Sequence, residues 1–263
     1  MQLFAIFGNP VSHSRSPLMH NNVFKKLGFK GAYIRIPLED GSKLKETFFK
    51  LKLTGANITV PHKEAAFNAC DEIRGFANKV GVVNTIINEN GRLIGYNTDA
   101  DGFMHAIKPF GTIKTILVLG AGGTSKALSQ RFKDEGIDVT VVNRSQRRLE
   151  SFKTNGFKTQ TWDDVIIKSY DLIVNTTSAG LEDENLPAPK EILEPLLKQA
   201  SFAADAIYGK VTPFLQLCAT LNITAKDGAD MLLGQGVLAN DLFTHHTFSL
   251  EAIEKPMKES FLF

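Results

Sequence analysis

The most informative stretch of this 263-residue sequence is Thr115-Ile-Leu-Val-Leu-Gly-Ala-Gly-Gly-Thr-Ser125. Its first five residues predict a buried strand, and the glycines after them predict a sharp turn into a helix from Lys126. Backbone N–H groups at a helix N-terminus can bind a pyrophosphate, because the helix dipole favours negative charge there. The stretch therefore favours a dinucleotide-binding turn. Ser125 replaces the usual glycine or alanine, and a tight turn without a ligand is the alternative.

The residues after the next predicted strand indicate which dinucleotide is bound. Asn143-Arg-Ser-Gln-Arg-Arg148 lacks the Asp or Glu with which NAD-preferring folds hold the ribose hydroxyl. Its three arginines can instead bind a 2′-phosphate through paired N–H bonds and can stack on adenine. A solvated basic helix turn is the alternative, but cations at a helix N-terminus oppose the helix dipole. The segment therefore favours NADP(H) over NAD(H).

On both sides of this region, short apolar runs alternate with amphipathic segments, which is typical of α/β proteins with mostly parallel sheets. Strands are predicted at Leu3–Gly8, Ala32–Pro37, Ala56–Val60, Asn84–Asn88, Leu93–Tyr96, Thr115–Leu119, Asp138–Asn143, Leu172–Thr176 and Phe202–Ile207. The fourth and fifth of these form a hairpin, because a turn signal separates them. Helices at Asp230–His246 and Leu250–Glu259 have no strand between them, so we expect them to return to the first domain.

Composition excludes several classes of protein. The net charge of +2 gives no broad field to hold a polyanion, so we expect no nucleic-acid partner. No basic leader and no apolar stretch of about 18 residues is present, which predicts a cytoplasmic protein without a membrane partner. Cys70 and Cys218 lie far apart and outside any cluster of metal-ligating residues, so neither a disulfide scaffold nor a metal site is expected.

A second group of polar residues follows the predicted strands of the first half of the chain. Hydroxyl groups are frequent in Asn9-Pro-Val-Ser-His-Ser-Arg-Ser-Pro17, and Thr59 and Lys63 come at or just after the end of the third strand. Asn84-Thr85 and Asn97-Thr98-Asp99 flank the hairpin. Ligands of open α/β sheets bind at the carboxyl ends of strands. Together these residues predict a small polar pocket with one cation and one carboxylate, which suits a hydroxylated carboxylate ligand.

Each of these residues also has a purely structural explanation. Ser16 with Pro17 after it suits a helix N-cap, which leaves Ser14 without a structural role. Lys63 would be an exposed helix residue, Asn84 a turn residue and Asp99 an N-cap.

Several short motifs occur along the chain in a fixed order. They are Gly8-Asn9-Pro10 with Ser14-Arg15-Ser16-Pro17, Gly55 to Glu64, Val83-Asn84-Thr85, Gly95 to Asp99, Gly120 to Gly123, Asn143-Arg144-Ser145, Asn175 to Ser178, Asp205 to Tyr208 with Thr212-Pro213, and Asp227-Gly228 with Met231 and Gln235. Each motif is weak alone, but in this order and at these spacings they resemble the shikimate dehydrogenase family. The resemblance covers nearly the whole chain.

The resemblance implies a reversible, NADPH-dependent reduction of 3-dehydroshikimate to shikimate, a step of aromatic amino-acid biosynthesis, with Lys63 and Asp99 as the catalytic pair. It implies substrate contacts from Ser14, Ser16, Thr59, Lys63, Asn84, Asp99, Tyr208 and Gln235. It implies NADP contacts from Gly120, Ala121, Gly122, Gly123, Thr124, Asn143, Arg144, Ser145, Arg148, Ile207 and Gly228. Residues 1–100 with 230–263 would form the substrate-binding and catalytic domain, and residues 101–229 a Rossmann-type domain, in a monomer or homodimer.

The sequence departs from the family pattern at three places. The segment Gly209–Val211 is one residue shorter than usual, Asp230 replaces a glycine, and His62 replaces an aromatic or apolar residue. Two other functions fit the same motifs. One is a quinate/shikimate dehydrogenase with broader substrate choice, and the other is a noncatalytic sensor that binds NADP(H) or a metabolite.

Overall fold

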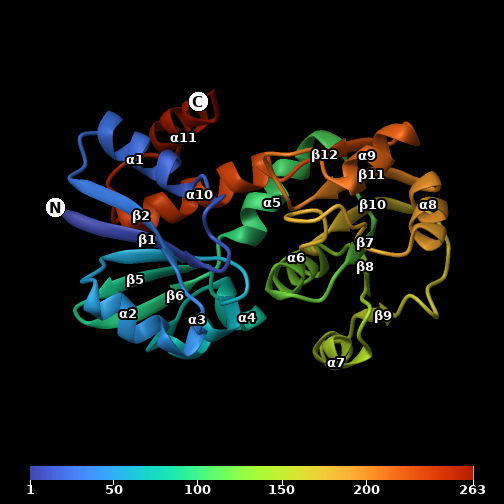
Figure 1. The fold of residues 1–263 in the computed structure, drawn as a ribbon, viewed down its shortest axis with the longest axis horizontal. Coiled ribbons are helices and arrows are strands. Elements are labelled where there is room, and N and C mark those ends of the chain that lie inside the picture. The colour runs from blue at the N-terminus through green and yellow to red at the C-terminus, as the bar shows by residue number, and fades with distance from the viewer. Residues whose placement is uncertain (263) are drawn as a thin grey trace. The chain divides into compact units, whose positions relative to one another are not determined.

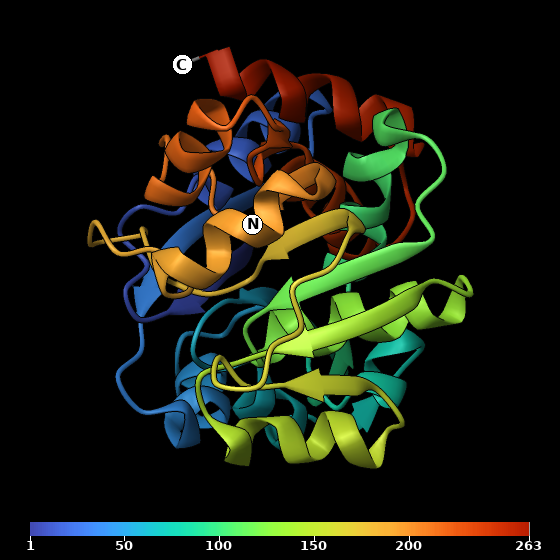
Figure 2. The same ribbon diagram turned by 90° about the vertical axis from the view of Figure 1, so that its right-hand side faces the viewer.

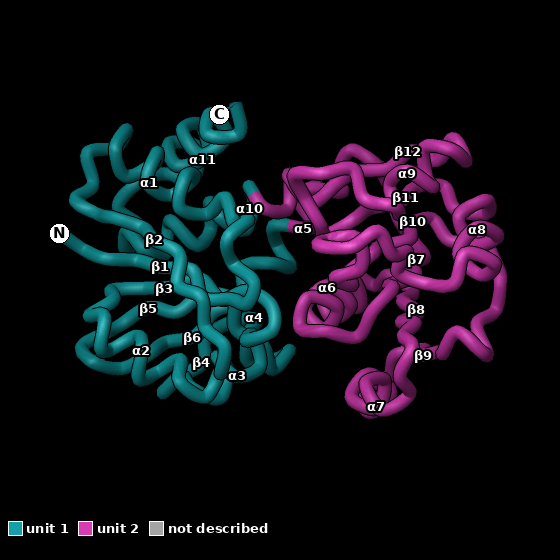
Figure 3. Tube along the Cα trace, viewed as in Figure 1, with its two compact units in different colours: residues 1–102, 233–263 teal, residues 103–232 magenta. Residues whose placement is uncertain are grey.

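The computed structural model describes residues 1–262, and the chain forms two compact units (Figures 1 and 3). Unit 1 comprises residues 1–102 together with the C-terminal residues from 233 on, and unit 2 comprises residues 103–232. No helix within residues 1–262 is both long enough and apolar enough to cross a membrane.

Unit 1 is built on a six-stranded sheet with the strand order β2-β1-β3-β5-β6-β4. Its strands are β1 (Gln2–Gly8), β2 (Gly31–Pro37), β3 (Gly55–Ile58), β4 (Glu72–Ile73), β5 (Thr85–Glu89) and β6 (Arg92–Tyr96). Strand β1 runs parallel to β2 and β3, whereas β5 runs antiparallel to both β3 and β6. The expected β5–β6 hairpin is therefore present, and it reverses the direction of the sheet at β5.

Helices cover both faces of this sheet. Those in or entering unit 1 are α1 (Ser16–Lys26), α2 (Leu44–Lys50), α3 (Lys63–Ala69), α4 (Phe76–Val80), α5 (Asp99–Ile107), α10 (Ala229–Phe243) and α11 (Leu250–Glu259), with the short 3-10 turns η1 (Gly41–Lys43) and η3 (Ser260–Leu262). Side chains alternate along β1, so Ala5 and Phe7 join a core that includes Phe48 of α2, while Phe4 and Ile6 join another. The sheet is thus buried on both sides.

The C-terminal helices return to unit 1, as the sequence predicts. The ring of Phe243 near the end of α10 lies 4.8 Å from that of Phe4, measured between centroids. In α1, Asn22 donates a hydrogen bond through Nδ2 to the carbonyl of Pro256 in α11, at 2.5 Å. These contacts place α10 and α11 on the β1 face that carries Phe4 and Ile6.

Unit 2 contains an entirely parallel sheet with the order β12-β11-β10-β7-β8-β9, whose strands run side by side in Figure 2. Its strands are β7 (Thr115–Leu119), β8 (Asp138–Val142), β9 (Lys158–Gln160), β10 (Tyr170–Asn175), β11 (Ala200–Asp205) and β12 (Thr224–Lys226). The connecting helices are α6 (Gly123–Asp134), α7 (Gln146–Thr154), α8 (Lys190–Lys198) and α9 (Pro213–Thr220), and the 3-10 turn η2 (Lys108–Phe110) precedes β7. This is the doubly wound order of dinucleotide-binding domains, with its switch point between β7 and β10.

All nine predicted strands are present, and their ends differ from the prediction by at most two residues. Three strands were not predicted, namely β4, β9 and β12, which are two or three residues long and lie at sheet edges. A strand this short buries too few side chains to produce a periodic apolar pattern. The predicted α/β class with two open sheets is confirmed.

Replacing Phe243 by alanine tests the attachment of α10 to unit 1. Phe243 is 1% exposed within the aromatic cluster on β1, so Phe243→Ala removes a packed ring and leaves a cavity. We expect a loss of about 3–5 kcal/mol in the free energy of unfolding, measured by urea denaturation with circular dichroism. Leu262 is 83% exposed, and Leu262→Ala is the control that should change stability by less than about 0.5 kcal/mol. Equal effects of the two substitutions would contradict the packing of α10 described above.

Candidate active site

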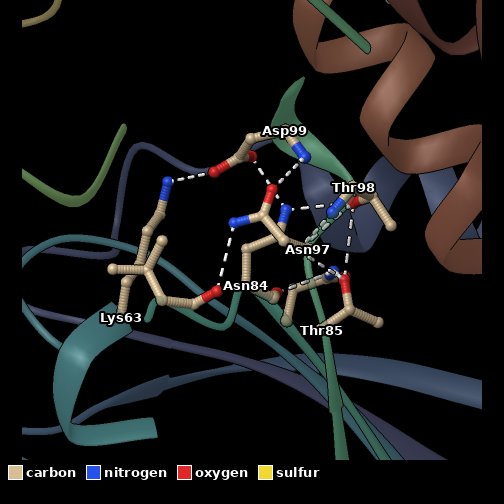
Figure 4. Close-up of polar contacts among 8 residues, drawn as sticks. Lys63, Asn84, Thr85, Asn97, Thr98 and Asp99 are labelled. Atoms are coloured by element: carbon tan, nitrogen blue, oxygen red, sulfur yellow. Dashed lines mark hydrogen bonds and ion pairs between the residues drawn. The ribbon is translucent and has the colours of Figure 1, made fainter. Parts of the chain in front are cut away.

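Lys63 and Asp99 meet in unit 1 as a buried ion pair (Figure 4). Lys63 is the first residue of α3, after β3, and Asp99 is the first residue of α5, after β6. The Lys63 ammonium donates a hydrogen bond to Oδ2 of Asp99, and the two residues are 8% and 5% exposed. Lys63 is therefore not the exposed helix residue that the structural explanation requires.

Asn84 holds the second oxygen of the same carboxylate (Figure 4). Its Nδ2 donates to Oδ1 of Asp99 at 2.8 Å and to the hydroxyl of Thr98 at 3.0 Å. Its Oδ1 accepts from the backbone N–H of Thr98 at 2.8 Å and from the hydroxyl of Thr85 at 3.0 Å. The side chain of Asn97 accepts from the backbone N–H of Asp99 at 3.2 Å. The carboxylate is thus fixed in position, and Asn84 is not a surface turn residue.

A chain of hydrogen bonds continues from Asn84 into the sheet. The hydroxyl of Tyr33 donates to Oδ1 of Asn57 at 2.7 Å, and Nδ2 of Asn57 donates to the Thr85 hydroxyl at 3.0 Å. Because Thr85 donates to Asn84 and Asn84 donates to Asp99, every donor in this chain points toward the carboxylate. Hydrogen bonds aligned in this way polarise one another. No role of Asn57 or Tyr33 was predicted, although an asparagine inside the strand Gly55-Ala-Asn-Ile58 was a signal in the sequence.

The hydroxyl groups of Ser14 and Ser16 form a second polar cluster in unit 1. Ser14 Oγ donates to Ser16 Oγ at 3.2 Å and accepts from the backbone N–H of Ser16 at 3.3 Å, and both residues are buried. Arg15, not Ser16, is the N-cap residue of α1, and it forms no side-chain cap. The predicted capping role of Ser16 is wrong, because Arg15 already has helical backbone angles. Ser14, which was expected to lack a structural role, supplies the hydrogen bond at this position instead.

Arg35 of β2 also contributes to this cluster, although no role was predicted for it. Its guanidinium donates through Nε at 2.9 Å and through Nη2 at 2.5 Å to the backbone carbonyl of Ser14. The available signal was a charged residue within the otherwise apolar run Tyr33-Ile-Arg-Ile36. Arg35 therefore fixes the segment that presents the two serine hydroxyls.

Thr59 and Gln235 also lie in unit 1. A β-carbon at Gly8 would collide with the methyl group of Thr59, so the end of β1 packs tightly against the residue after β3. A β-carbon at Gly102 would lie 2.5 Å from the backbone nitrogen of Gln235, so α10 packs on α5 three residues after Asp99. Seven of the eight predicted substrate contacts thus belong to unit 1, whereas Tyr208 belongs to unit 2.

The glycine-rich turn of unit 2 joins β7 to α6 and has the shape that a dinucleotide needs. Gly120 has φ +105°, a value that side-chain-bearing residues rarely adopt. No atom lies within 4 Å of where a β-carbon of Gly122 would be, so the space beside this residue is open. Ser125 donates a hydrogen bond to the carbonyl of Gly120 at 2.7 Å. The serine that departs from the fingerprint therefore closes the turn.

The three arginines predicted to bind a 2′-phosphate lie at the start of α7. Arg144, Arg147 and Arg148 are exposed, and within the described part of the chain their side chains have no hydrogen-bond or ion-pair partner. Ser145 is the N-cap residue of α7 but forms no side-chain cap. Nδ2 of Asn143 donates to the Ser145 carbonyl at 3.1 Å. The guanidinium groups are thus available to a phosphate at the carboxyl end of β8, next to the glycine-rich turn after β7.

Two further predicted cofactor contacts lie close together in unit 2. Gly228, just before α10, donates its backbone N–H to the carbonyl of Ile207 at 2.9 Å. A β-carbon at Gly228 would collide with the carbonyl of Ala206, so only glycine allows this approach. Within residues 1–262, no group of three or more His, Cys, Asp or Glu residues is placed to hold a metal ion.

Comparisons with known proteins identify the family of this chain. The family model described as "Shikimate dehydrogenase substrate binding domain" matches residues 6–86, and the model described as "Shikimate / quinate 5-dehydrogenase" matches residues 105–185. A relative from Helicobacter hepaticus, named shikimate dehydrogenase (NADP(+)), is 42% identical, with 98% of this chain and 97% of the relative covered. One of the same name from Helicobacter pylori strain P12 is 45% identical, with 93% of each covered.

The chain belongs to the shikimate dehydrogenase family. Solved structures support the assignment over both units. Shikimate dehydrogenase 1 from Peptoclostridium difficile has a TM-score of 0.87 at 28% identity. The match covers 100% of this chain and 98% of that structure. The shikimate 5-dehydrogenase from Thermus thermophilus, solved in complex with NADP(H) and shikimate, has a TM-score of 0.82 at 32% identity. The match covers 99% of this chain and 100% of that structure.

The three departures from the shikimate dehydrogenase pattern are accommodated locally. The shortened segment Gly209–Val211 lies in a loop whose ends are both bonded to Asp205. Asp230 is exposed and pairs with Lys226 at 2.6 Å. The imidazole Nε2 of His62 lies 2.5 Å from the carbonyl of Leu38, so this residue ties the start of α3 to the segment after β2.

The buried carboxylate of Asp205 organises the loop that carries Tyr208. It accepts hydrogen bonds from the Thr212 hydroxyl at 2.6 Å, from Nδ2 of Asn175 at 3.0 Å and from the backbone N–H of Ile207 at 3.0 Å. Asp205 is fully buried, and this desolvation raises the pKa of its carboxyl above the ordinary 3.8, although the hydrogen bonds oppose the shift.

This raised pKa predicts a pH-dependent contribution to stability. The folded protein binds the Asp205 proton more tightly than the unfolded chain, so the contribution is full below pH 3.8 and is lost as the pH rises through the folded pKa. Asp205→Asn mimics the protonated acid and removes this dependence. Urea unfolding between about pH 3 and 7 should therefore show the wild type losing stability relative to Asp205→Asn as the pH rises.

Asp171 is a control of opposite sign. Backbone N–H groups of Lys114 and Thr115 hydrogen-bond to its carboxylate and lower its pKa below 3.8. The wild type should therefore lose stability relative to Asp171→Asn as the pH falls through that lowered pKa. A difference between wild type and Asp205→Asn that is constant with pH, or that has the sign expected for Asp171, would contradict the raised pKa of Asp205.

Proposed function

We propose that this chain catalyses the reversible, NADPH-dependent reduction of 3-dehydroshikimate to shikimate, with Lys63 and Asp99 as the catalytic pair. The observation that carries the proposal is the buried ion pair between these residues, with Asn84 on the second carboxylate oxygen. Reduction of a ketone needs a cation that can give a proton to the substrate oxygen, and an anion beside it holds that cation in place. Membership of the shikimate dehydrogenase family supports the same reaction.

We assign substrate binding mainly to unit 1. Ser14 and Ser16 supply hydroxyl groups for the substrate carboxylate. Thr59, Asn84 and Gln235 supply polar groups for the ring oxygens, beside Lys63 and Asp99. Support for this assignment comes from burial, since Ser14, Ser16 and Asn84 are each 3% exposed or less yet belong to hydrogen-bonded clusters of polar groups.

We assign the binding of NADPH to unit 2. The open turn at Gly120–Thr124 fits a pyrophosphate, and the exposed arginines Arg144 and Arg148, with Asn143 and Ser145, fit a 2′-phosphate and its adenosine. Ile207 and Gly228 form a close backbone pair where no side chain could be tolerated at position 228, which fits a flat ring packed on backbone. When bound, NADPH supplies the hydride for the reduction.

Lys63 and Asp99 have distinct roles in this reaction. Negative charge develops on the substrate oxygen as the carbonyl is reduced, and the Lys63 ammonium can donate a hydrogen bond and then a proton to that oxygen. Asp99 holds the ammonium in place and can accept a hydrogen bond from a neighbouring substrate hydroxyl. In the oxidative direction, Lys63 receives the proton. Asn84, Thr98 and Asn97 keep Asp99 in the position that this geometry needs.

The catalytic role of Lys63 predicts a specific kinetic pattern. Lys63→Ala should lower kcat by about 10²- to 10⁴-fold and should raise KM much less, because the lysine acts mainly in the transition state. Steady-state assays of NADPH formation from shikimate and NADP+ measure both constants. Lys50, an exposed lysine at the end of α2, offers the control Lys50→Ala, which should be close to wild type. An unchanged kcat in Lys63→Ala would rule the role out.

The 2′-phosphate assignment predicts that one arginine affects one cofactor only. Arg144→Ala should raise the KM for NADPH by about tenfold or more, because it removes a charge-assisted contact, and should leave turnover with NADH nearly unchanged. Arg148→Ala should do the same more weakly. Exposed Lys153, at the other end of α7, provides the charge-matched control Lys153→Ala. Parallel losses with NADPH and NADH would count against the assignment.

Assays of the wild type with shikimate, quinate and 3-dehydroshikimate separate the proposed enzyme from its alternatives. Turnover of shikimate with NADP+ and of 3-dehydroshikimate with NADPH, without comparable turnover of quinate, fits the proposal. Comparable turnover of quinate would indicate the broader enzyme. Binding of NADP(H) without turnover of any of the three would indicate a sensor and would overturn the proposed function.

A further inference from the structure

Arg35 holds the backbone of Ser14, in the cluster formed by the Ser14 and Ser16 hydroxyl groups. It lies on β2, the edge strand beside β1 in Figure 1, and it points to the same face of the sheet as Tyr33, because side chains two apart on a strand share a face. Tyr33 begins the hydrogen-bond chain that ends at Asp99. Arg35, one side-chain position closer to the carboxyl end of β2, reaches Ser14. One face of a single strand therefore supports both polar clusters of unit 1.

No carboxylate within residues 1–262 neutralises the positive charge of Arg35. Its two hydrogen bonds go to a backbone carbonyl, which carries no net charge, and no carboxylate among the described residues pairs with it. Its Nη1 amino group has no hydrogen-bond partner within residues 1–262. The neighbouring Arg15 is directed elsewhere, since its Nη2 donates to the Ser260 carbonyl and its guanidinium lies over the ring of Phe261. Arg35 is thus the arginine whose guanidinium lies against Ser14.

We propose that Arg35 is a specificity-determining residue whose guanidinium, seated on the Ser14 carbonyl, attracts the substrate carboxylate to the Ser14 and Ser16 hydroxyls. The proposal rests on the proposed function, in which these hydroxyls receive that carboxylate. The carbonyl oxygen and the hydroxyl oxygen of one serine are only four bonds apart. A substrate carboxylate that accepts a hydrogen bond from the Ser14 hydroxyl therefore lies closer to the Arg35 guanidinium than the electrostatic screening length of about 10 Å.

The charge acts differently from the hydroxyl groups. Serine hydroxyls can donate hydrogen bonds to a neutral ester carbonyl as well as to a carboxylate, so they discriminate poorly between the two. A cation next to them favours the anion alone. Because Arg35 is exposed to solvent, its effect is moderate and depends on salt. Arg35 also holds the Ser14 backbone, so the experiment must separate charge from position.

The test compares the wild type with Arg35→Gln and Arg35→Lys, using NADP+ with shikimate and with its uncharged methyl ester. Arg35→Gln should raise the KM for shikimate about five- to tenfold. Its kcat should stay within about twofold, because carboxylate binding is equal in the ground and transition states. The KM for the ester should change by less than about twofold. Arg35→Lys, which keeps the charge, should recover most of the affinity for shikimate.

Ionic strength supplies a measurement that a merely structural role would not change. Raising the salt from about 10 mM to about 300 mM should raise the wild-type KM for shikimate more than that of Arg35→Gln. Lys50→Gln is the matched control for loss of one positive charge in unit 1. Lys50 lies at the end of α2, shortly before the start of β3. It therefore lies at the end of the sheet opposite to the carboxyl ends of β1 and β3. It should match the wild type throughout.

The outcomes separate this inference from the proposed function. Equal losses with shikimate and its ester, or an Arg35→Lys variant as weak as Arg35→Gln, would show a structural role and would overturn the electrostatic one. If the wild type turns over shikimate and the KM of Arg35→Gln for shikimate equals that of the wild type, only the role of Arg35 is overturned. A wild type that does not turn over shikimate would overturn the proposed function and this inference with it.

Discussion

The ion pair between Lys63 and Asp99 sets the main requirement on unit 1. Removing two charges from water is costly, and their mutual attraction compensates for this cost only when hydrogen bonds satisfy the remaining atoms. Here the second oxygen of Asp99 accepts from Asn84, and four successive donors starting at Tyr33 point toward the same carboxylate. The buried polar residues of β2, β3 and β5 are therefore part of one arrangement that keeps a single carboxylate in place.

The topology of the sheet explains how residues so far apart in sequence meet. Strand β5 is antiparallel to both of its neighbours, with Asn57 opposite Thr85 and Thr85 opposite Tyr96. The start of β5 therefore lies at the same end of the sheet as the carboxyl ends of β3 and β6. Lys63 follows β3, Asn84 precedes β5 and Asp99 follows β6, so all three lie at that end of the sheet. In a fully parallel sheet the start of β5 would lie at the opposite end. The sheet of unit 2 is fully parallel, and there the predicted cofactor contacts all follow the carboxyl ends of strands.

Much of this arrangement could be predicted from the sequence because local signals were strong. The glycines before α6, the arginines after β8 and the turn between β5 and β6 each depend on backbone conformation or charge within a few residues. The role of Arg35 could not be predicted, because its partner is a backbone carbonyl 21 positions away and a carbonyl leaves no trace in the sequence. The capping role expected of Ser16 failed for a related reason, since the backbone angles of Arg15 decide where α1 begins.

A double-mutant cycle on Lys63 and Asp99 tests the shared role of the ion pair most directly. The quantity to measure is kcat/KM for shikimate oxidation by NADP+, in the wild type, Lys63→Met, Asp99→Asn and the double variant. If the two groups act as one unit, the double variant is about as slow as the slower single variant, because either change already breaks the unit. Losses that multiply in the double variant would show that the lysine and the aspartate act independently, and would contradict the central role of their contact.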